Sequence, residues 1–138
     1  MRMRVRVDMI DALRLLSRRT RREKLLGLSR LRSLGRLALK ALPAVLRALH
    51  SVDDEVRDLA AAVIEEIGPP ARNAIPAIVR LLRMRPRYSL GEALVGIGMP
   101  AVPALGRLTA DKNRRVRRIA CWALTHPKLT REIQAYGR

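Results

Sequence analysis

Apolar residues recur at spacings of three and four along the chain, most clearly between residues 41 and 68. This spacing places them on one face of an α-helix. Pro43 suits the first turn of a helix, where its missing N–H costs nothing, and Gly68 suits a helix end. The polar segment 51–55 separates two apolar stretches. The pattern therefore predicts a helical hairpin, meaning two antiparallel helices joined by a turn.

The same hairpin recurs along the chain. Pro43 is matched 33 residues later by Pro76, and a further 27 residues later by Pro103. One hairpin cannot bury its own apolar face, so a helix–turn–helix period of this length predicts stacked repeats. We expect a single domain spanning 1–138, with repeats at about 5–35, 35–68, 68–98 and 98–127 and a C-terminal cap at 128–138.

Several matching residues resemble the short HEAT-like repeats of phycobilisome-lyase-type repeat proteins. They are Ala-Ile-Pro-Ala-Ile at 74–78, the Val-Arg pairs at 56–57 and 116–117, and the Ile-Gly endings at 67–68 and 97–98. The resemblance covers roughly Val5 to Pro127. It implies an all-α fold, a right-handed α-solenoid of about four HEAT-like hairpins with a short C-terminal capping helix. It also implies a binding scaffold or, less readily, an accessory subunit of a lyase-like enzyme.

The sequence also supports predictions for individual helices and turns. Ile10 and Leu26 fall on the apolar faces of the two helices of the first repeat, so both are expected to point inward. Ser51 with Asp54 fits a capping box at the start of the helix that follows. In the third repeat the turn is about three residues shorter, and Gly91 and Gly96 lower helix propensity. The third repeat is therefore the predicted weak or hinge-like unit.

The net charge of +17 adds an expected class of partner. Residues 1–50 carry 14 basic and 3 acidic side chains, residues 51–70 carry 1 and 6, and residues 71–138 carry 14 and 3. A strongly basic surface attracts nucleic acid, acidic protein segments or anionic lipid. A GC-rich coding sequence would raise the arginine content equally well, so the charge alone does not identify a partner.

Other residue types narrow the function classes. One Trp, two Tyr and no Phe argue against an aromatic platform for nucleic-acid bases. Cys121 is the only cysteine, which excludes an internal disulfide and favours a reducing, cytoplasmic location. No apolar run approaches the ~18 residues of a spanning helix. The N-terminus lacks the apolar core of a signal peptide.

No arrangement in the sequence is typical of catalysis. His50 and His126 are isolated from other metal-ligating residues. The acids at 53–55 fall at a helix start, where capping explains them. Cys121 and His126 lie five residues apart on one helix and do not point at each other. The sequence therefore predicts a protein that is not an enzyme, with no catalytic residue, metal site or cofactor.

Basic residues recur at two equivalent positions of the repeats. The first helices share one position: Arg14, Arg47, Arg80 and Arg107. The second helices begin with another: Lys24, Arg57, Arg87 and Arg117. No acids accompany the first column, so we expect a solvated face or a partner surface there. We expect the second column to pair with acids of the turns, since interface arginines usually have partners.

The turns between paired helices are the strongest candidate surface. Three of them are basic, although cations near a helix N-terminus are disfavoured by about 0.3–1 kcal/mol each. Three turns along one edge of the repeats thus carry cations at helix starts that disfavour them, and this recurrence suggests a function. The candidate partner- or phosphate-binding residues are Arg18, Arg19, Arg21, Arg22, Arg83, Arg85, Arg114, Arg115, Arg117 and Arg118.

Trp122 is a further candidate, as a partner anchor on the inner face. The commoner expectation is that such a Trp packs under the C-terminal tail, against Ile133 or Tyr136. Together these features predict a non-catalytic scaffold for an acidic or mixed-charge protein partner. The alternative is binding to nucleic-acid phosphates, as in HEAT-like DNA-binding proteins, although the acidic turn interrupts a continuous basic track.

Overall fold

The computed structural model describes residues 3–137, which contain α-helices and short 3-10 helices but no β-strand. The predicted all-α class is confirmed. Residues 1, 2 and 138 of the predicted domain lie outside the described part. The paired helices are α1 (Met3–Leu16) with α2 (Arg21–Leu34), α3 (Leu42–Leu49) with α4 (Asp54–Ile67), α5 (Ile75–Met84) with α6 (Tyr88–Ile97), and α7 (Val102–Leu108) with α8 (Arg114–Leu124).

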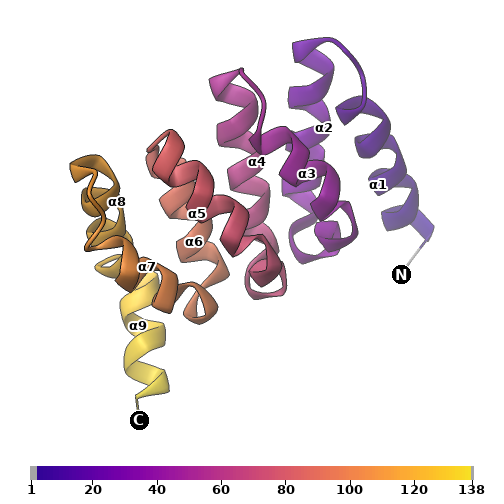
Figure 1. Cartoon of the computed structure of the whole chain (residues 1–138). Helices are drawn as coiled ribbons and strands as arrows, with labels where there is room; N and C mark the ends of the chain where they lie inside the picture. Colours follow the sequence, from indigo (N-terminus) through magenta and orange to yellow (C-terminus); the bar gives the residue numbers. More distant parts are fainter. Residues whose placement is uncertain (1–2, 138) are drawn as a thin grey trace.

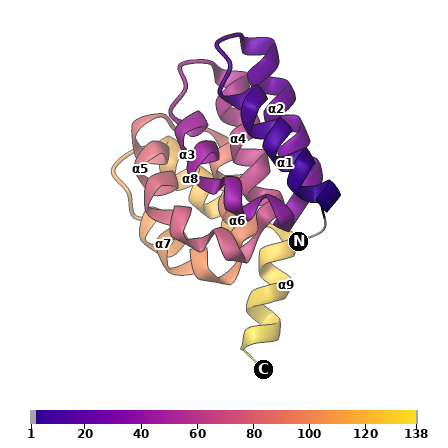
Figure 2. The same ribbon diagram turned by 90° about the vertical axis from the view of Figure 1, so that its right-hand side faces the viewer.

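Glycines end the second helices of the first three pairs, as the sequence predicts. Gly35, Gly68 and Gly98 have φ angles of +56°, +79° and +86°, a region that other residues adopt only with strain. Three 3-10 helices then lead to the next pair: η1 (Gly35–Ala41), η2 (Pro69–Ala74) and η3 (Met99–Ala101). A last helix, α9 (Pro127–Tyr136), follows α8 and projects beyond the other helices (Figures 1 and 2).

The four pairs lie side by side in chain order (Figure 1). The second helices pack directly on one another: α2 on α4, α4 on α6 and α6 on α8. We call the surface that these second helices present the second-helix face. Among residues 3–137, no helix combines the length and the apolar character that crossing a membrane requires.

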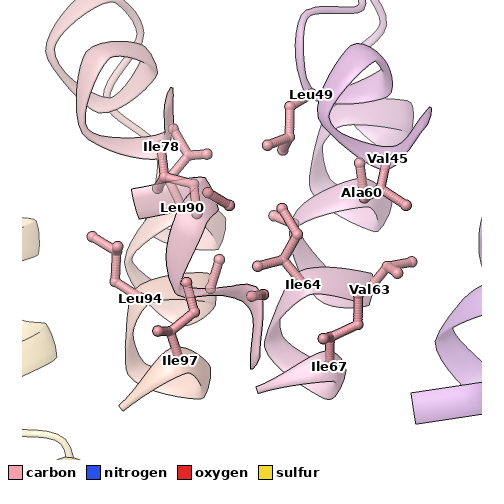
Figure 3. Close-up of a cluster of buried hydrophobic side chains, with 14 of the residues drawn as sticks. Val45, Leu49, Ala60, Val63, Ile64, Ile67, Ile78, Leu90, Leu94 and Ile97 are labelled. Atoms are coloured by element: carbon pink, nitrogen blue, oxygen red, sulfur yellow. The ribbon is translucent and has the colours of Figure 1, made fainter. Parts of the chain in front are cut away.

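Aliphatic side chains make up the core between neighbouring pairs. Figure 3 shows one part of this core, in which side chains of α3 and α4 face those of α5 and α6. The labelled residues are Val45, Leu49, Ala60, Val63, Ile64, Ile67, Ile78, Leu90, Leu94 and Ile97. The buried cluster continues from Met9 to Leu129, and no buried polar or charged residue is found within residues 3–137.

The expectation for Ile10 and Leu26 is wrong, because they are 50% and 46% exposed. Leu26 occupies the position that Leu59 has one repeat later. Leu59 packs partly buried against the core and lines one groove together with Leu25 of the preceding repeat. No repeat precedes the first among the described residues. Leu26 therefore lacks, among the described residues, the neighbouring repeat that covers Leu59. Ile10 occupies the position of Pro43, Pro76 and Pro103 in the later repeats, and all three are exposed, so this position faces solvent in every repeat.

Two glycines of α6 allow this helix to pack closely against its neighbours. Gly91 and Gly96 are both buried, and a Cβ atom built on Gly96 would lie 2.5 Å from the Cα atom of Glu65 in α4. A Cβ atom on Gly91 would lie 2.7 Å from a methyl group of Ile119 in α8. The residues that the sequence suggests as a local weakness thus let α6 approach both neighbouring helices closely.

Candidate partner-binding surface

The second and fourth turns have the same local construction. Asp53 caps α4 by accepting bonds from two backbone N–H groups at 2.9 and 3.2 Å, and Asn113 caps α8 by accepting one at 2.9 Å. Two residues earlier, the side chains of Ser51 and Asp111 accept from the N–H groups of these caps at 3.2 and 3.0 Å. The expected capping box of Ser51 with Asp54 is therefore wrong. Asp53 is the cap.

One arginine closes each of these two turns. Nη1 of Arg57 donates to the carbonyl oxygen of Ser51 at 2.8 Å, and Nη1 of Arg117 donates to that of Asp111 at 2.8 Å. Arg57 also pairs with Asp54, and its side chain is only 12% exposed. The expected pairing of this column with turn acids is confirmed for Arg57. Arg117 holds backbone carbonyls instead, so we assign it to the turn and not to the candidate surface.

Ion pairs join consecutive repeats along the turn edge. Between the first and second repeats, Arg21 bonds Asp53 at 2.5 Å and Glu55 at 2.7 Å. Between the third and fourth, Nε of Arg83 lies 3.1 Å from Oδ1 of Asp111. Two of the predicted partner-binding arginines, Arg21 and Arg83, therefore have partners within the chain.

The junction between the second and third repeats uses Arg87. Its Nε and Nη2 atoms bond the two carboxylate oxygens of Asp58 at 2.8 and 2.5 Å, and Ser89 donates to the same carboxylate at 2.7 Å. The hydrogen bond from Arg87 lowers the pKa of Asp58 below its ordinary range, with Ser89 contributing. Arg87 also lies 3.6 Å from Asp54. Neighbouring arginines thus pair with the acidic turn on both sides.

Six candidate arginines remain free of such contacts. Within residues 3–137, no ion pair or side-chain hydrogen bond involves Arg19, Arg22, Arg85, Arg114, Arg115 or Arg118, and all six are exposed. Arg18 has one long pair, 3.7 Å from Glu23. The densest group surrounds the first turns of α8. We call it the α8 basic cluster, and its members are Lys112, Arg114, Arg115 and Arg118.

A groove lies beside this cluster on the second-helix face. Helices α4 and α6 both end one residue before a glycine, but α4 has 14 residues and α6 has 10. Helix α6 therefore lacks the first turn that α4 has, and a groove of about 580 Å³ opens there. We call it the α6 notch. Its lining includes Asp58 of α4, Arg87, Tyr88 and Glu92 at the start of α6, and Arg115 and Arg118 of α8.

Trp122 packs against Tyr88, which lines the notch. Its ring meets the ring of Tyr88 edge-on, with centroids 5.3 Å apart, and that of His126 at 5.6 Å. Of the two tail residues expected against Trp122, Ile133 is partly buried against the same core as Trp122, whereas Tyr136 is 81% exposed. Local sequence patterns could not reveal the partnership with Tyr88, because the two rings lie 34 residues apart and meet only when α6 packs against α8.

The histidines have structural contacts. His126 caps α9 by accepting from the backbone N–H of Lys128 at 3.2 Å, and Nδ1 of His50 lies 2.9 Å from the carbonyl oxygen of Leu46. No group of three or more His, Cys, Asp or Glu side chains in the described part of the chain could hold a metal ion.

Comparisons with known proteins concern the fold alone. No protein-family model matches the chain, and no curated protein matches it. The structure is similar to the crystal structure of an engineered protein, a target of the Northeast Structural Genomics Consortium, with a TM-score of 0.61 and 18% sequence identity. The match covers 92% of this chain and 62% of that one, so this chain spans less than two thirds of its length.

Proposed function

We propose that this protein is a non-catalytic scaffold that binds an acidic or mixed-charge protein partner. We also propose that its four hairpins form a right-handed α-solenoid of HEAT-like repeats. The lone, exposed Cys121 agrees with a reducing compartment such as the cytoplasm. The observation that carries the functional proposal is the α8 basic cluster, because its side chains are exposed and have no partner among residues 3–137.

Local stability does not account for the cluster. Cations at a helix N-terminus are disfavoured, and the equivalent first turn of α4 carries Asp54 and Glu55. The other turn arginines with defined contacts are engaged by acids or carbonyls of this chain. Guanidinium groups bind carboxylates through paired hydrogen bonds. An acidic protein segment would supply the carboxylates that the cluster lacks.

Mixed charge in the notch favours a protein over nucleic acid. Glu92 is exposed and lines the same groove as Arg115 and Arg118. A phosphate backbone is negative throughout and would be repelled by Glu92, whereas a protein segment can present both signs. The alternative keeps one argument in its favour. Arg21 pairs with Asp53 and Arg87 lies 3.6 Å from Asp54, and these contacts weaken the interruption of the basic edge by the acidic turn.

A nuclease-treated pulldown from the source cell tests the proposal. The triple variant Arg114→Glu/Arg115→Glu/Arg118→Glu reverses the cluster but keeps Arg117, which holds the turn. The matched control carries the same charge change on exposed connector residues, as Arg36→Glu/Lys40→Glu/Arg72→Glu.

We expect a protein with acidic segments to be retained by the wild type and by the control and lost by the cluster variant. Retention by all three proteins would contradict the proposal. Capture that disappears on nuclease treatment would support the alternative, and binding to random duplex DNA should then fall steeply as salt rises.

A further inference from the structure

We infer that the α6 notch is the docking site for an acidic helical segment of the partner protein, whose carboxylates bind Arg115 and Arg118. This inference rests on the proposed function and names the place and the chemistry of contact. The exposed surface of the notch, its shape and its charge each support it.

The notch is formed by an omission in an otherwise regular stack. Ile64 and Ile67 of α4 match Leu94 and Ile97 of α6 in position and in complete burial, so the two helices share one register at their C-terminal ends. At their N-terminal ends, α6 is one turn shorter. The groove lies at this shortened end of α6 and reaches from α4 to α8, and this is the place that we assign to one turn of a partner helix.

The lining keeps a net positive charge, because Arg87 and Asp58 pair with each other and Arg115 and Arg118 together outweigh Glu92. In α4 the corresponding turn carries Asp54 and Glu55, and both make ion pairs with arginines. In the notch, Arg115 and Arg118 are exposed, and no acid within residues 3–137 pairs with them. Their i, i+3 spacing places both on one face of α8. Asp58, on the opposite side, is already bonded by Arg87 and Ser89.

A second copy of the chain is a poor occupant. Its acidic turn is engaged by its own arginines, since Arg21 holds Asp53 and Glu55 and Arg57 holds Asp54. Two copies that each carry a charge of +17 also repel each other. A partner with unpaired acids meets neither obstacle.

The chain contains its own reporter for this site. Trp122 is the only tryptophan, and its ring lies 5.3 Å from that of Tyr88, which lines the notch. Filling the notch should change the emission of Trp122 without any label. The probe is a capped peptide of glutamate and alanine of about 16 residues, long enough to form a helix in water. A lysine–alanine peptide and a single-stranded oligothymidylate of similar length serve as comparisons.

We expect a saturable change of emission with the glutamate peptide and none with the lysine peptide. Arg115→Glu/Arg118→Glu should weaken the affinity by at least about tenfold, because two charge-assisted contacts are reversed. Glu92→Gln should strengthen it by roughly two- to fivefold, because a repulsive charge is removed. Arg36→Glu/Arg72→Glu, which alters net charge away from the notch, should leave the affinity within about twofold.

Other outcomes overturn distinct parts of the argument. If Lys112→Glu/Arg114→Glu abolishes binding and Arg115→Glu/Arg118→Glu does not, the cluster binds acids but the notch does not. If Arg36→Glu/Arg72→Glu weakens binding as much as Arg115→Glu/Arg118→Glu does, the peptide is attracted by net charge alone and the notch has no specific role. Binding of oligothymidylate in place of the glutamate peptide would refute the proposed protein partner itself. Unchanged circular dichroism of each variant establishes that loss of binding is not loss of fold.

Discussion

Replacing Gly96 by alanine tests how closely α6 packs on α4. A Cβ atom at this position would lie 2.5 Å from the Cα atom and 2.6 Å from the carbonyl oxygen of Glu65. Both are backbone atoms of the neighbouring helix, so no rotation of a side chain can relieve the contact. The two helices have to move apart to accept the methyl group.

Two opposing effects determine how much the free energy of unfolding falls in the Gly96→Ala variant. Alanine is better than glycine inside a helix by about 1 kcal/mol. Non-bonded carbons normally lie 3.5–4.0 Å apart, so the helices must separate by about 1 Å, which loosens the buried contacts around Ile64, Leu94 and Ile97. Overpacking of a core typically costs 1–3 kcal/mol. Because the contact involves backbone, we take the upper end of that range and expect a net loss of about 2 kcal/mol.

Gly106 is the matched control, because it lies in α7 and a Cβ atom there would meet nothing within 4 Å. The Gly106→Ala variant should be as stable as the wild type or more stable, by up to about 1 kcal/mol. Urea unfolding of both variants, followed by far-ultraviolet circular dichroism and by Trp122 fluorescence, measures the two changes. A Gly96→Ala variant as stable as the wild type would refute the close approach of α6 to α4.

Three further predictions concern charged side chains. Arg117→Ala should lower the free energy of unfolding by about 1–2 kcal/mol, because the guanidinium holds carbonyls of the fourth turn; Arg118→Ala, measured alongside in urea, should change it by less than about 0.5 kcal/mol. The hydrogen bond from Arg87 lowers the pKa of Asp58, so the ionised Asp58 carboxylate stabilises the fold above a pH of about 4. This stabilisation is lost as the pH falls through the pKa of Asp58 in the folded state. The difference in stability between the wild type and Asp58→Asn should shrink as the pH falls below about 4. A difference that stays constant with pH would contradict this role of the Arg87–Asp58 bond. Burial raises the pKa of Glu65, with Glu92 and Glu66 adding repulsion, so folding is opposed once Glu65 ionises. Glu65→Gln should therefore be more stable than the wild type at pH 7, and thermal unfolding should show that this gain disappears as the pH falls below about 4.

Much of the secondary structure was predictable because its signals are local. Periodic apolar residues, prolines at helix starts and Gly68 and Gly98 at helix ends act within a few residues of their own position. The N-cap at Thr20, which accepts from the N–H of Glu23, follows from the same kind of signal. The shortened third turn was also visible in the sequence, although its consequence, the notch, was not.

The candidate site was only half predictable. The sequence identified the basic turns, but it could not separate the arginines that hold the fold from those that remain exposed. Arg21 pairs with Asp53 and Arg83 pairs with Asp111, partners 32 and 28 residues away. These distances equal about one repeat, so each pairing depends on how neighbouring hairpins align.

The sequence by itself determined the helices, their glycine ends and the repeat of helix pairs, because each depends on backbone conformation and on the spacing of apolar residues within a turn or two. The tertiary structure alone decided which charges are paired, which glycines lie in close contacts, and that Tyr88, which lines the notch, meets Trp122. These features depend on the register between stacked helices. That register is set by packing of aliphatic side chains from different repeats, and no local stretch of sequence encodes it.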